Sequence, residues 1–399
     1  MKPLLAGLAL SLTFGSSALA QPPLTQSNDA AGALDMELFA LWEVAACGKP
    51  VEPPDANAGL ERLKDKAGKV IADHCKALDK ILAAYTADWL TPARPFFKTL
   101  VPSNIPKTIV YPFAGGDLMT ALAVFPDLTE LTTISLESGG DARGIFRVDA
   151  AQLGQALSSN RRFINELVKW NHNRTIDLNN MELSPVPSQL IFALTGLKAH
   201  GFEPVGLRAL AMEKDGSLRV LGPSDFKAID ASVENFKGGK KNKALNDAFS
   251  HYELRFRRPG ETTVRIYRHF EMNLADRVLS EDRRILNHLE KKGRVSAMTK
   301  AASHLLWHGG FSQIRNYLKA NIAWMVSDST GLNPRHLEPD KWEQTVWGRF
   351  DIALFNPTTD GQVALRELYA SQPERKLPFK LFGYPTKTLK PTLIVTRPR

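Results

Sequence analysis

The spacing of apolar positions changes near residue 100. Residues 34–47 and 59–85 carry apolar side chains at helical spacing, and no strand-like run occurs between residues 29 and 100. Further along, short apolar runs alternate with helical patterns. We therefore expect a helical N-terminal region, 21–100, and an α/β domain, 101–399. Residues 89–97, which include Pro92 and Pro95, are interpreted as the link between them.

The α/β domain opens with a compact repeat of strand, turn, helix and strand. Residues 108–113 form an apolar run, 114–117 a glycine turn, 118–125 an apolar helix and 129–136 a second apolar run. Four such elements within about 30 residues predict a βαβ unit, in which parallel strands are joined by a right-handed crossover.

The later elements follow the same mixed pattern. Predicted helices cover residues 150–170, 187–200, 277–292, 295–307 and 311–321. Predicted hairpins pair 205–212 with 217–221 and 252–258 with 262–269, and further strands are expected at 322–326 and near 345–355, 379–383 and 392–396. Alternation of Leu254 and Phe256 with Arg255 and Arg257 predicts one buried face in the second hairpin.

These patterns predict an α/β fold. Its sheet should be mixed but mostly parallel, flanked by helices and Rossmann-like in its first half, and preceded by the helical N-terminal cap.

The first twenty residues have the features of a secretory signal peptide. Lys2 precedes an apolar stretch at 4–14, and residues 16–20 end in the small residues that signal peptidase recognises. We expect cleavage after Ala20 and a periplasmic or secreted protein. No later window reaches the length of a membrane span, so no transmembrane segment is expected after cleavage.

Composition and charge narrow the partners. The 399 residues are 43% hydrophobic and 23% charged, with a formal charge of +9, which favours a globular protein that binds anionic surfaces. Outside the cytoplasm, the expected partner is a small molecule or an anionic envelope component rather than nucleic acid. The basic run at 237–243 lacks aromatic residues for base stacking and is interpreted as a solvated loop.

The chain has two cysteines, Cys47 and Cys75. An oxidising compartment favours a disulfide between them, which would staple the two predicted helices at 34–47 and 59–85. Two separate buried thiols are the alternative. A redox-active pair is disfavoured because the Cys-x-x-Cys spacing is absent.

The glycine turn is the first candidate site. Gly115 and Gly116 lie between a predicted strand and helix, where missing side chains allow a ligand to approach the backbone. Asp117 is also suited to cap the helix, and that role argues against phosphate binding there. Glu137 follows the second strand, at the place where nucleotide-binding βαβ units hold a ribose.

Residues 108–137 resemble the first two strands of Rossmann-like methyltransferases that bind S-adenosylmethionine. Residues 111–116 stand in place of their glycine loop and Glu137 in place of their acidic ribose ligand, but Phe113 or Ala114 replaces the first glycine. Because an exported protein would not ordinarily meet that molecule, no cofactor is expected.

A broader resemblance is to a family of exported bacterial proteins of unknown function. The residues that carry it are Tyr111-Pro-Phe-Ala-Gly-Gly-Asp117, Phe125-Pro126, Ser135-Leu-Glu137, Lys300-Ala-Ala-Ser303, Ser327-Asp-Ser-Thr-Gly331 and Leu377-Pro-Phe379. The resemblance implies no established reaction.

Two further groups carry possible chemistry. His304 and His308 would share one face of a helix, but the glutamate of a zinc protease motif and an assured third ligand are missing, so no metal site is expected. Ser327 and Asp328 begin a hydroxyl-rich turn after an apolar strand, which fits either a substrate clamp or a turn that bonds its own backbone.

The leading hypothesis from these residues is a non-catalytic exported protein that binds a ligand or envelope component. Its ligand would lie in a cleft at the Gly115-Gly116 turn. The alternative is a periplasmic hydrolase whose acid and base come from Asp117, Glu137, Asp328 and His308, which would require those side chains to converge.

Overall fold

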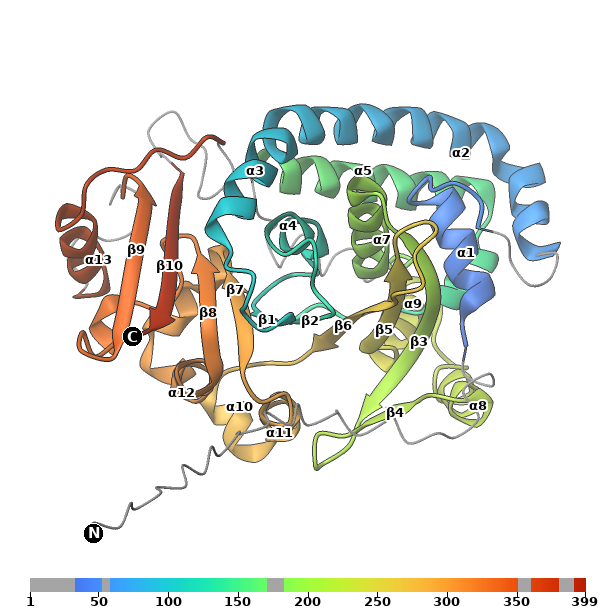
Figure 1. Ribbon diagram of the computed structural model, residues 1–399. Coiled ribbons are helices and arrows are strands. Elements are labelled where there is room, and N and C mark those ends of the chain that lie inside the picture. The colour runs from blue at the N-terminus through green and yellow to red at the C-terminus, as the bar shows by residue number, and fades with distance from the viewer. Residues whose placement is uncertain (1–32, 52–57, 171–182, 351–359, 380–390) are drawn as a thin grey trace, which may run out of the picture.

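Parallel strands form the middle of a mixed sheet, as the sequence pattern predicts. The computed structural model describes residues 33–51, 58–170, 183–350, 360–379 and 391–399 (Figure 1). Within these residues, ten strands form one sheet in the order β4-β3-β5-β6-β2-β1-β7-β8-β10-β9. The signal peptide and parts of the strands expected at 345–355 and 379–383 lie outside the described residues.

The strands are β1 (Thr108–Pro112), β2 (Glu130–Ser135), β3 (Glu203–Met212), β4 (Leu218–Val220), β5 (His251–Arg257), β6 (Arg265–Glu271), β7 (Val295–Thr299), β8 (Ile322–Ser327), β9 (Trp342–Gly348) and β10 (Thr392–Pro398). The α-helices are α1 (Asp35–Val44), α2 (Ala58–Tyr85), α3 (Thr91–Leu100), α4 (Leu118–Val124), α5 (Ala150–Trp170), α7 (Ser188–His200), α8 (Pro223–Ser232), α9 (Gly238–Ala248), α10 (Asp276–Glu281), α11 (Arg284–Glu290), α12 (Ser312–Asn321) and α13 (Asp360–Ala370). Shorter helical turns are η1 (Thr86–Leu90), η2 (Ala142–Phe146), η3 (Ala301–Trp307), η4 (Gly309–Phe311) and η5 (Pro334–His336).

The strand order reverses between β1 and β7. Strands β6, β2, β1, β7 and β8 are parallel neighbours, and the chain passes from β1 through β2 to β6 before it returns to β7 on the other side of β1. This is the 3-2-1-4-5 order of a doubly wound sheet. The predicted βαβ unit is confirmed, with β1 and β2 parallel from Thr108↔Glu130 to Pro112↔Ile134.

Antiparallel strands extend both edges. The two predicted hairpins are confirmed as the pairs β3 with β4 and β5 with β6, and β10 lies antiparallel between β8 and β9. Leu254 and Phe256 are fully buried, whereas Arg255 and Arg257 are partly exposed. The alternation in that hairpin was therefore interpreted correctly.

Helices cover both faces of the sheet. Ile109 and Tyr111 pack into the buried cluster that contains α4 and α7, whereas Val110 belongs to the cluster with α11 and α12. Figure 1 shows α3, α4 and α7 on one side of the central strands, and α10, α11 and α12 on the other. Alternate residues of one strand serve the two cores because successive side chains point to opposite faces.

The N-terminal helices are attached directly to the sheet. Leu34 donates a backbone hydrogen bond to the carbonyl oxygen of Leu207 in β3, at 3.0 Å, and the Asp35 carboxylate accepts one from the Leu207 N–H, at 3.1 Å. Leu38 and Leu41 are fully buried in the same cluster as Ile109. Residues of the two predicted regions thus share one hydrophobic core.

A disulfide joins the end of α1 to the interior of α2, as predicted. The Cα atoms of Cys47 and Cys75 are 5.5 Å apart, and no free cysteine occurs in the chain. Closing a loop of 28 residues contributes about 3 kcal/mol in the chain-entropy description. Among the described helices, none combines the length and the apolar content that a membrane span requires.

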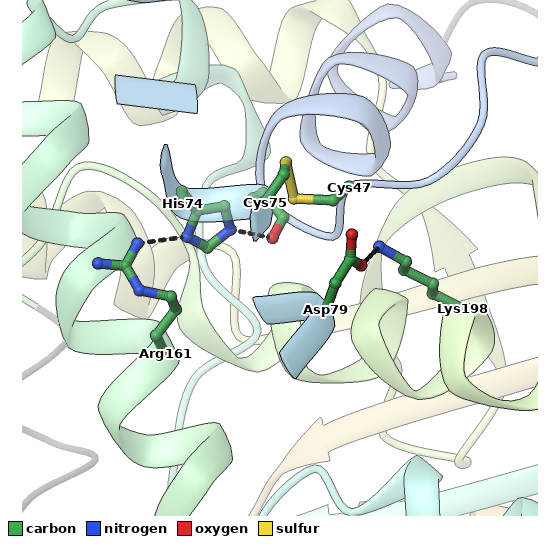
Figure 2. Close-up of a disulfide and its surroundings, with 7 residues drawn as sticks. Cys47, His74, Cys75, Asp79, Arg161 and Lys198 are labelled. Atoms are coloured by element: carbon green, nitrogen blue, oxygen red, sulfur yellow. Dashed lines mark hydrogen bonds and ion pairs between the residues drawn. A yellow bond between two sulfur atoms is a disulfide. The ribbon is translucent and has the colours of Figure 1, made fainter. Parts of the chain in front are cut away.

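Polar contacts surround the disulfide and fasten α2 to its neighbours (Figure 2). His74 Nε2 lies 2.8 Å from the Ala45 carbonyl oxygen, and Arg161 of α5 donates to His74 Nδ1 at 2.7 Å. Burial lowers the pKa of His74 to about 4, so the ring is neutral and Nε2 carries its proton. Lys198 of α7 pairs with Asp79 of α2 at 2.7 Å.

The largest correction concerns residues 295–307, which were predicted as one helix. The structure has β7 at Val295–Thr299, followed by η3. The strand is short, and Ser296, Ala297 and Met298 at its centre have no β-branched side chain, so periodicity does not distinguish it from a buried helix. Its five residues are all buried between β1 and β8, which favours the strand.

Three smaller segments differ in detail from what the sequence pattern suggested. Residues 277–292 form two helices, α10 and α11, because Asp282 has an extended backbone between them. Residues 89–97 are helical, with Pro92 at the start of α3, a position where a missing N–H is tolerated. The basic run at 237–243 begins α9 instead of forming a loop, and Lys243 pairs with Asp247 one turn later.

Candidate functional site

Polar side chains gather at the carboxyl ends of the central parallel strands. Asp117 follows β1, Glu137 follows β2, Lys300 follows β7, and Ser327 with Asp328 ends β8. All five side chains are buried. Neighbouring parallel strands end at the same edge of a sheet, and ligands of open α/β sheets bind outside that edge where the strand order reverses.

An ion pair spans the reversal point. Lys300 Nζ lies 2.6 Å from Asp117 Oδ2, and it also donates to Thr120 Oγ1 at 3.0 Å. The other oxygen of Asp117 accepts from the Thr120 N–H at 3.0 Å and so caps α4. Asp117 is therefore both the helix cap that was predicted and the partner of a buried lysine.

Tyr111 of β1 also contacts this pair. Its hydroxyl donates to Asp117 Oδ2 at 3.3 Å. Burial and the nearby charges of Asp117 and Asp328 raise the pKa of Tyr111 well above its usual value, so the phenol is neutral.

Asp328 organises the turn that follows β8. Its Oδ1 accepts from the Thr330 N–H at 2.8 Å, and its Oδ2 accepts from the Ala301 N–H at 2.9 Å. Burial raises its pKa, although these hydrogen bonds and Lys300 act in the opposite direction. The turn was interpreted either as a clamp or as a locally bonded turn. It has the local bonds, and it is also joined to the end of β7.

Two non-glycine residues beside this cluster adopt left-handed backbone conformations. Phe113, directly after β1, has φ of 59°, and Ala301, directly after Lys300, has φ of 53°. Each costs roughly 1 kcal/mol relative to glycine, and such conformations are concentrated at binding and catalytic sites. Both residues are partly exposed, which places strained backbone at the accessible rim of the buried cluster.

Backbone conformation and close packing explain the two glycines of the predicted turn. Gly115 and Gly116 have φ of 56° and 78°, which disfavour any larger residue. A Cβ on Gly116 would lie 2.0 Å from Gln189 Oε1 of α7, so an amide from the helical layer already contacts this backbone. Gly115 is partly exposed, whereas Gly116 is buried.

Close packing also explains Gly331 at the end of the hydroxyl-rich turn. A Cβ there would lie 2.2 Å from Ser327 Oγ and 3.2 Å from Thr299 Oγ1. Within the described residues these two hydroxyl oxygens are buried without a hydrogen-bond partner. A buried hydroxyl in that state is a candidate to bind a polar ligand or water.

Glu137 is held on the β6 side of β2. Its backbone carbonyl oxygen accepts from His269 Nε2 at 2.9 Å, and its side chain is only 3% exposed. Burial lowers the pKa of His269 to about 4, which keeps that ring neutral. Glu137 thus lies two residues after β2, close to the predicted strand end.

The two histidines proposed as possible metal ligands lie on η3 and directly after it. Their ring centroids are 6.1 Å apart, His304 contacts the Ala301 carbonyl oxygen, and His308 is exposed. The helical i, i+4 geometry expected for them is wrong because η3 is a 3-10 helix that ends at Trp307. Over the described part of the chain, no cluster of three or more metal-binding side chains occurs.

Lys300 is the site residue that sequence reasoning missed. It was quoted only as part of a motif, because the predicted helix over 295–307 placed it in a helix interior. The available signal was a lysine directly after a short apolar run, 295–299, which resembles the other strand ends. Asp117 and Asp328 are brought to Lys300 by the fold, as the contacts of Asp117 and of Ala301 show.

Searches against protein-family models, curated proteins and solved structures find no match for this chain. The class of protein that the structure itself defines is an α/β protein with a doubly wound centre and a polar cluster at its strand-order reversal.

Proposed function

We propose that the chain is an exported, non-catalytic binding protein whose ligand contacts the backbone at Gly115 and Ala301. The observation that carries this proposal is the meeting of the glycine turn, Lys300 and the 327–331 turn at the reversal point between β1 and β7. Open α/β sheets bind their ligands at this position.

The charges near the reversal point favour a small polar molecule over a phosphate. Lys300 is already paired with Asp117, and Asp328 adds a second carboxyl group nearby. At the start of α4, where an anion would bind, the Thr120 N–H already donates to the Asp117 carboxylate. Of the two partner classes expected from the sequence, this site suits the small molecule better than an anionic envelope component.

The disulfide supports the export part of the proposal. Cys47 and Cys75 have the geometry of a structural disulfide, and such bonds persist mainly in oxidising compartments. Together with the predicted signal peptide, this favours a periplasmic or secreted protein.

A nucleoside-type ligand is the second candidate. The strand order β6-β2-β1-β7-β8 extends the likeness to Rossmann-like proteins beyond residues 108–137, and Glu137 follows β2 by two residues, near the place where such folds hold a ribose. The buried position of Glu137 and the carboxylate of Asp117 at the turn favour the first candidate.

The hydrolase alternative gains less support. Asp117 pairs with Lys300 and Asp328 accepts from the neighbouring Ala301 N–H, but His308, one of the four acid and base candidates, is exposed directly after η3. A general base must lie within hydrogen-bond reach of the group it deprotonates.

The test is native mass spectrometry of the full chain exported to the periplasm of a bacterial host. We expect a bound small molecule on the wild-type protein and its loss from the Lys300→Met variant. Lys198→Met is the matched control, since Lys198 also pairs with an aspartate at 2.7 Å but lies on α7, at the contact with α2. The proposal fails if Lys300→Met, folded by circular dichroism, retains the molecule.

Two additional measurements separate the candidates. Titration of the purified protein with S-adenosylmethionine and with adenosine should give no binding, and binding that is abolished by Glu137→Gln would favour the nucleoside-type ligand instead. N-terminal sequencing of the exported protein should begin at Gln21, and an intact N-terminus in the cytoplasm would remove the export part.

A further inference from the structure

A cavity lies between α5 and the start of α9. Its volume is about 450 Å³, within the range of small-molecule sites. Residues 183–188 form its third wall. The residues that line it, apart from its backbone glycines, are mainly neutral hydrogen-bonding side chains, such as Gln152, Gln155, Ser159, Asn160 and Asn242.

The walls of this cavity are preformed. Asn242 and Asn246, one turn apart on α9, donate to the carbonyl oxygens of Leu183 and Ser184 at 3.0 and 3.1 Å. Asn246 also accepts from the Asp141 N–H at 3.0 Å, which ties α9 to the loop after β2. Side chains that are fixed in this way lose little conformational entropy when a ligand binds.

Two polar side chains of the cavity have unused hydrogen-bonding capacity. Asn160 is 1% exposed, and its Nδ2 donates to the Ala156 carbonyl oxygen at 2.9 Å. Among the described residues its Oδ1 has no hydrogen-bond partner, and the same is true of Ser188 Oγ on the opposite wall. Buried polar atoms are nearly always satisfied, so two of them in one cavity indicate a hydrogen-bonding ligand or water.

The described lining residues include one charged side chain, which is a cation. Arg162 lines it, stacked on the Phe163 ring with 4.7 Å between the guanidinium carbon and the ring centroid. None of the described lining residues carries a carboxylate. The N-terminus of α9 reaches the cavity at Gly238 and Gly239, and within the described residues no side chain caps this end. A helix N-terminus without a cap favours an anionic group.

We propose that this cavity binds an anionic saccharide, such as a uronic acid or a sugar phosphate. Amide and hydroxyl side chains suit the many hydroxyl groups of a sugar, Asn160 Oδ1 accepts from one of them, and Arg162 with the first turn of α9 holds the charged group. A volume of about 450 Å³ accommodates one or two sugar rings. Its lining residues include none of the strand-end cluster, so the proposal does not depend on the function proposed for that cluster.

The test uses saturation-transfer NMR and calorimetry on the full chain. The probes are glucuronate, galacturonate and glucose 1-phosphate, with neutral glucose and galactose as their matched partners. We expect the anionic probes to bind more tightly than the neutral ones, by about tenfold, the effect of one charged hydrogen bond.

Two variants locate the binding. Arg162→Gln, at an exposed position, should weaken the anionic probes about tenfold and leave the neutral ones unchanged. Arg277→Gln removes the same charge from an exposed site on α10 and should have no effect. Asn160→Leu should weaken all five probes, with its melting temperature measured as a check on folding.

The proposal is overturned if no probe binds, if neutral and anionic sugars bind alike, or if Arg162→Gln and Arg277→Gln behave identically. Lys300→Met should leave this binding unchanged, so failure of the strand-end proposal and failure of this one are distinguishable.

Discussion

Two buried lysines flank β7, and their surroundings differ. Lys292, before the strand, pairs with Glu130, which also accepts from Arg268 at 3.0 Å, and Arg268 pairs with Glu253 at 2.9 Å. Lys300, after the strand, faces Asp117 and the more distant Asp328.

In the first cluster, two carboxylates face three cations, because Arg255 also pairs with Glu253 at 2.8 Å. The second has one cation for two carboxyl groups, together with strained backbone at Ala301 and an unpaired hydroxyl at Ser327 in the part of the chain that the structure describes. A satisfied network is what stability requires. Strain and unused hydrogen-bonding capacity indicate a site that is adapted to binding rather than to stability.

The largest expected effect is on the Lys292 cluster. Lys292→Met should lower the free energy of unfolding by about 3–5 kcal/mol, because it leaves the buried Glu130 with Arg268, which Glu253 also engages, as its remaining partner cation. Urea denaturation at pH 7 measures the loss. Adding Glu130→Gln to that variant should restore part of it, and a loss below about 1 kcal/mol would show that the network is not structural.

The two clusters should also respond to acid with opposite signs. Burial alone would raise the pKa of Glu130, but the charges of Lys292 and Arg268 hold it at about 2, below the unfolded value of 4.5. Ionised Glu130 contributes about 3 kcal/mol to the free energy of unfolding above pH 4.5, and this contribution is lost as the pH falls toward 2. The pKa of Asp328 is raised by burial, so its contribution becomes more favourable as the pH falls from that raised value toward 3.8.

The pH dependence of unfolding tests this contrast. Below pH 4.5, Glu130→Gln should show a shallower loss of stability than the wild-type protein. Asp328→Asn should show a steeper loss, because the opposing contribution of Asp328 is removed. Parallel curves for all three proteins would contradict the difference between the clusters.

A smaller effect is expected at Lys300. Lys300→Met should cost about 2 kcal/mol, less than Lys292→Met, because Asp117 keeps its hydrogen bonds from Thr120 and Tyr111. Urea denaturation of Lys300→Met and Lys292→Met, run alongside the mass-spectrometric assay, compares their losses of stability. If Lys300→Met is the more destabilising variant and no ligand is found, the Lys300 cluster is structural.

The smallest effect concerns backbone strain. Ala301→Gly should raise the free energy of unfolding by about 1 kcal/mol, because glycine adopts φ near 53° without a Cβ clash. Ala302→Gly, one residue further along η3, should instead be neutral or destabilising. Equal effects from both variants, measured by thermal unfolding, would remove strain as a distinguishing feature of this cluster.

Local sequence determined much of this fold. The pattern of Thr108 to Ser135 was sufficient for the first βαβ unit, since strand, glycine turn and apolar helix follow one another without interruption. The two hairpins and the long helices α2 and α5 have equally clear periodicity. Two cysteines in a chain with a predicted export signal were sufficient for the disulfide.

Tertiary structure decided the remainder. Val295 to Thr299 is a strand because β1 and β8 lie on either side of it, a condition that no local pattern contains. The ion pair of Asp117 with Lys300 joins residues far apart in sequence, and only the strand order brings them together. The sequence alone thus placed Asp117, Glu137 and Ser327 at or near strand ends, but it did not place Lys300 there. Long-range pairing decided which strand ends are neighbours. It also decided that residues 295–299 form a strand, because short strands and buried helices can have the same apolar pattern.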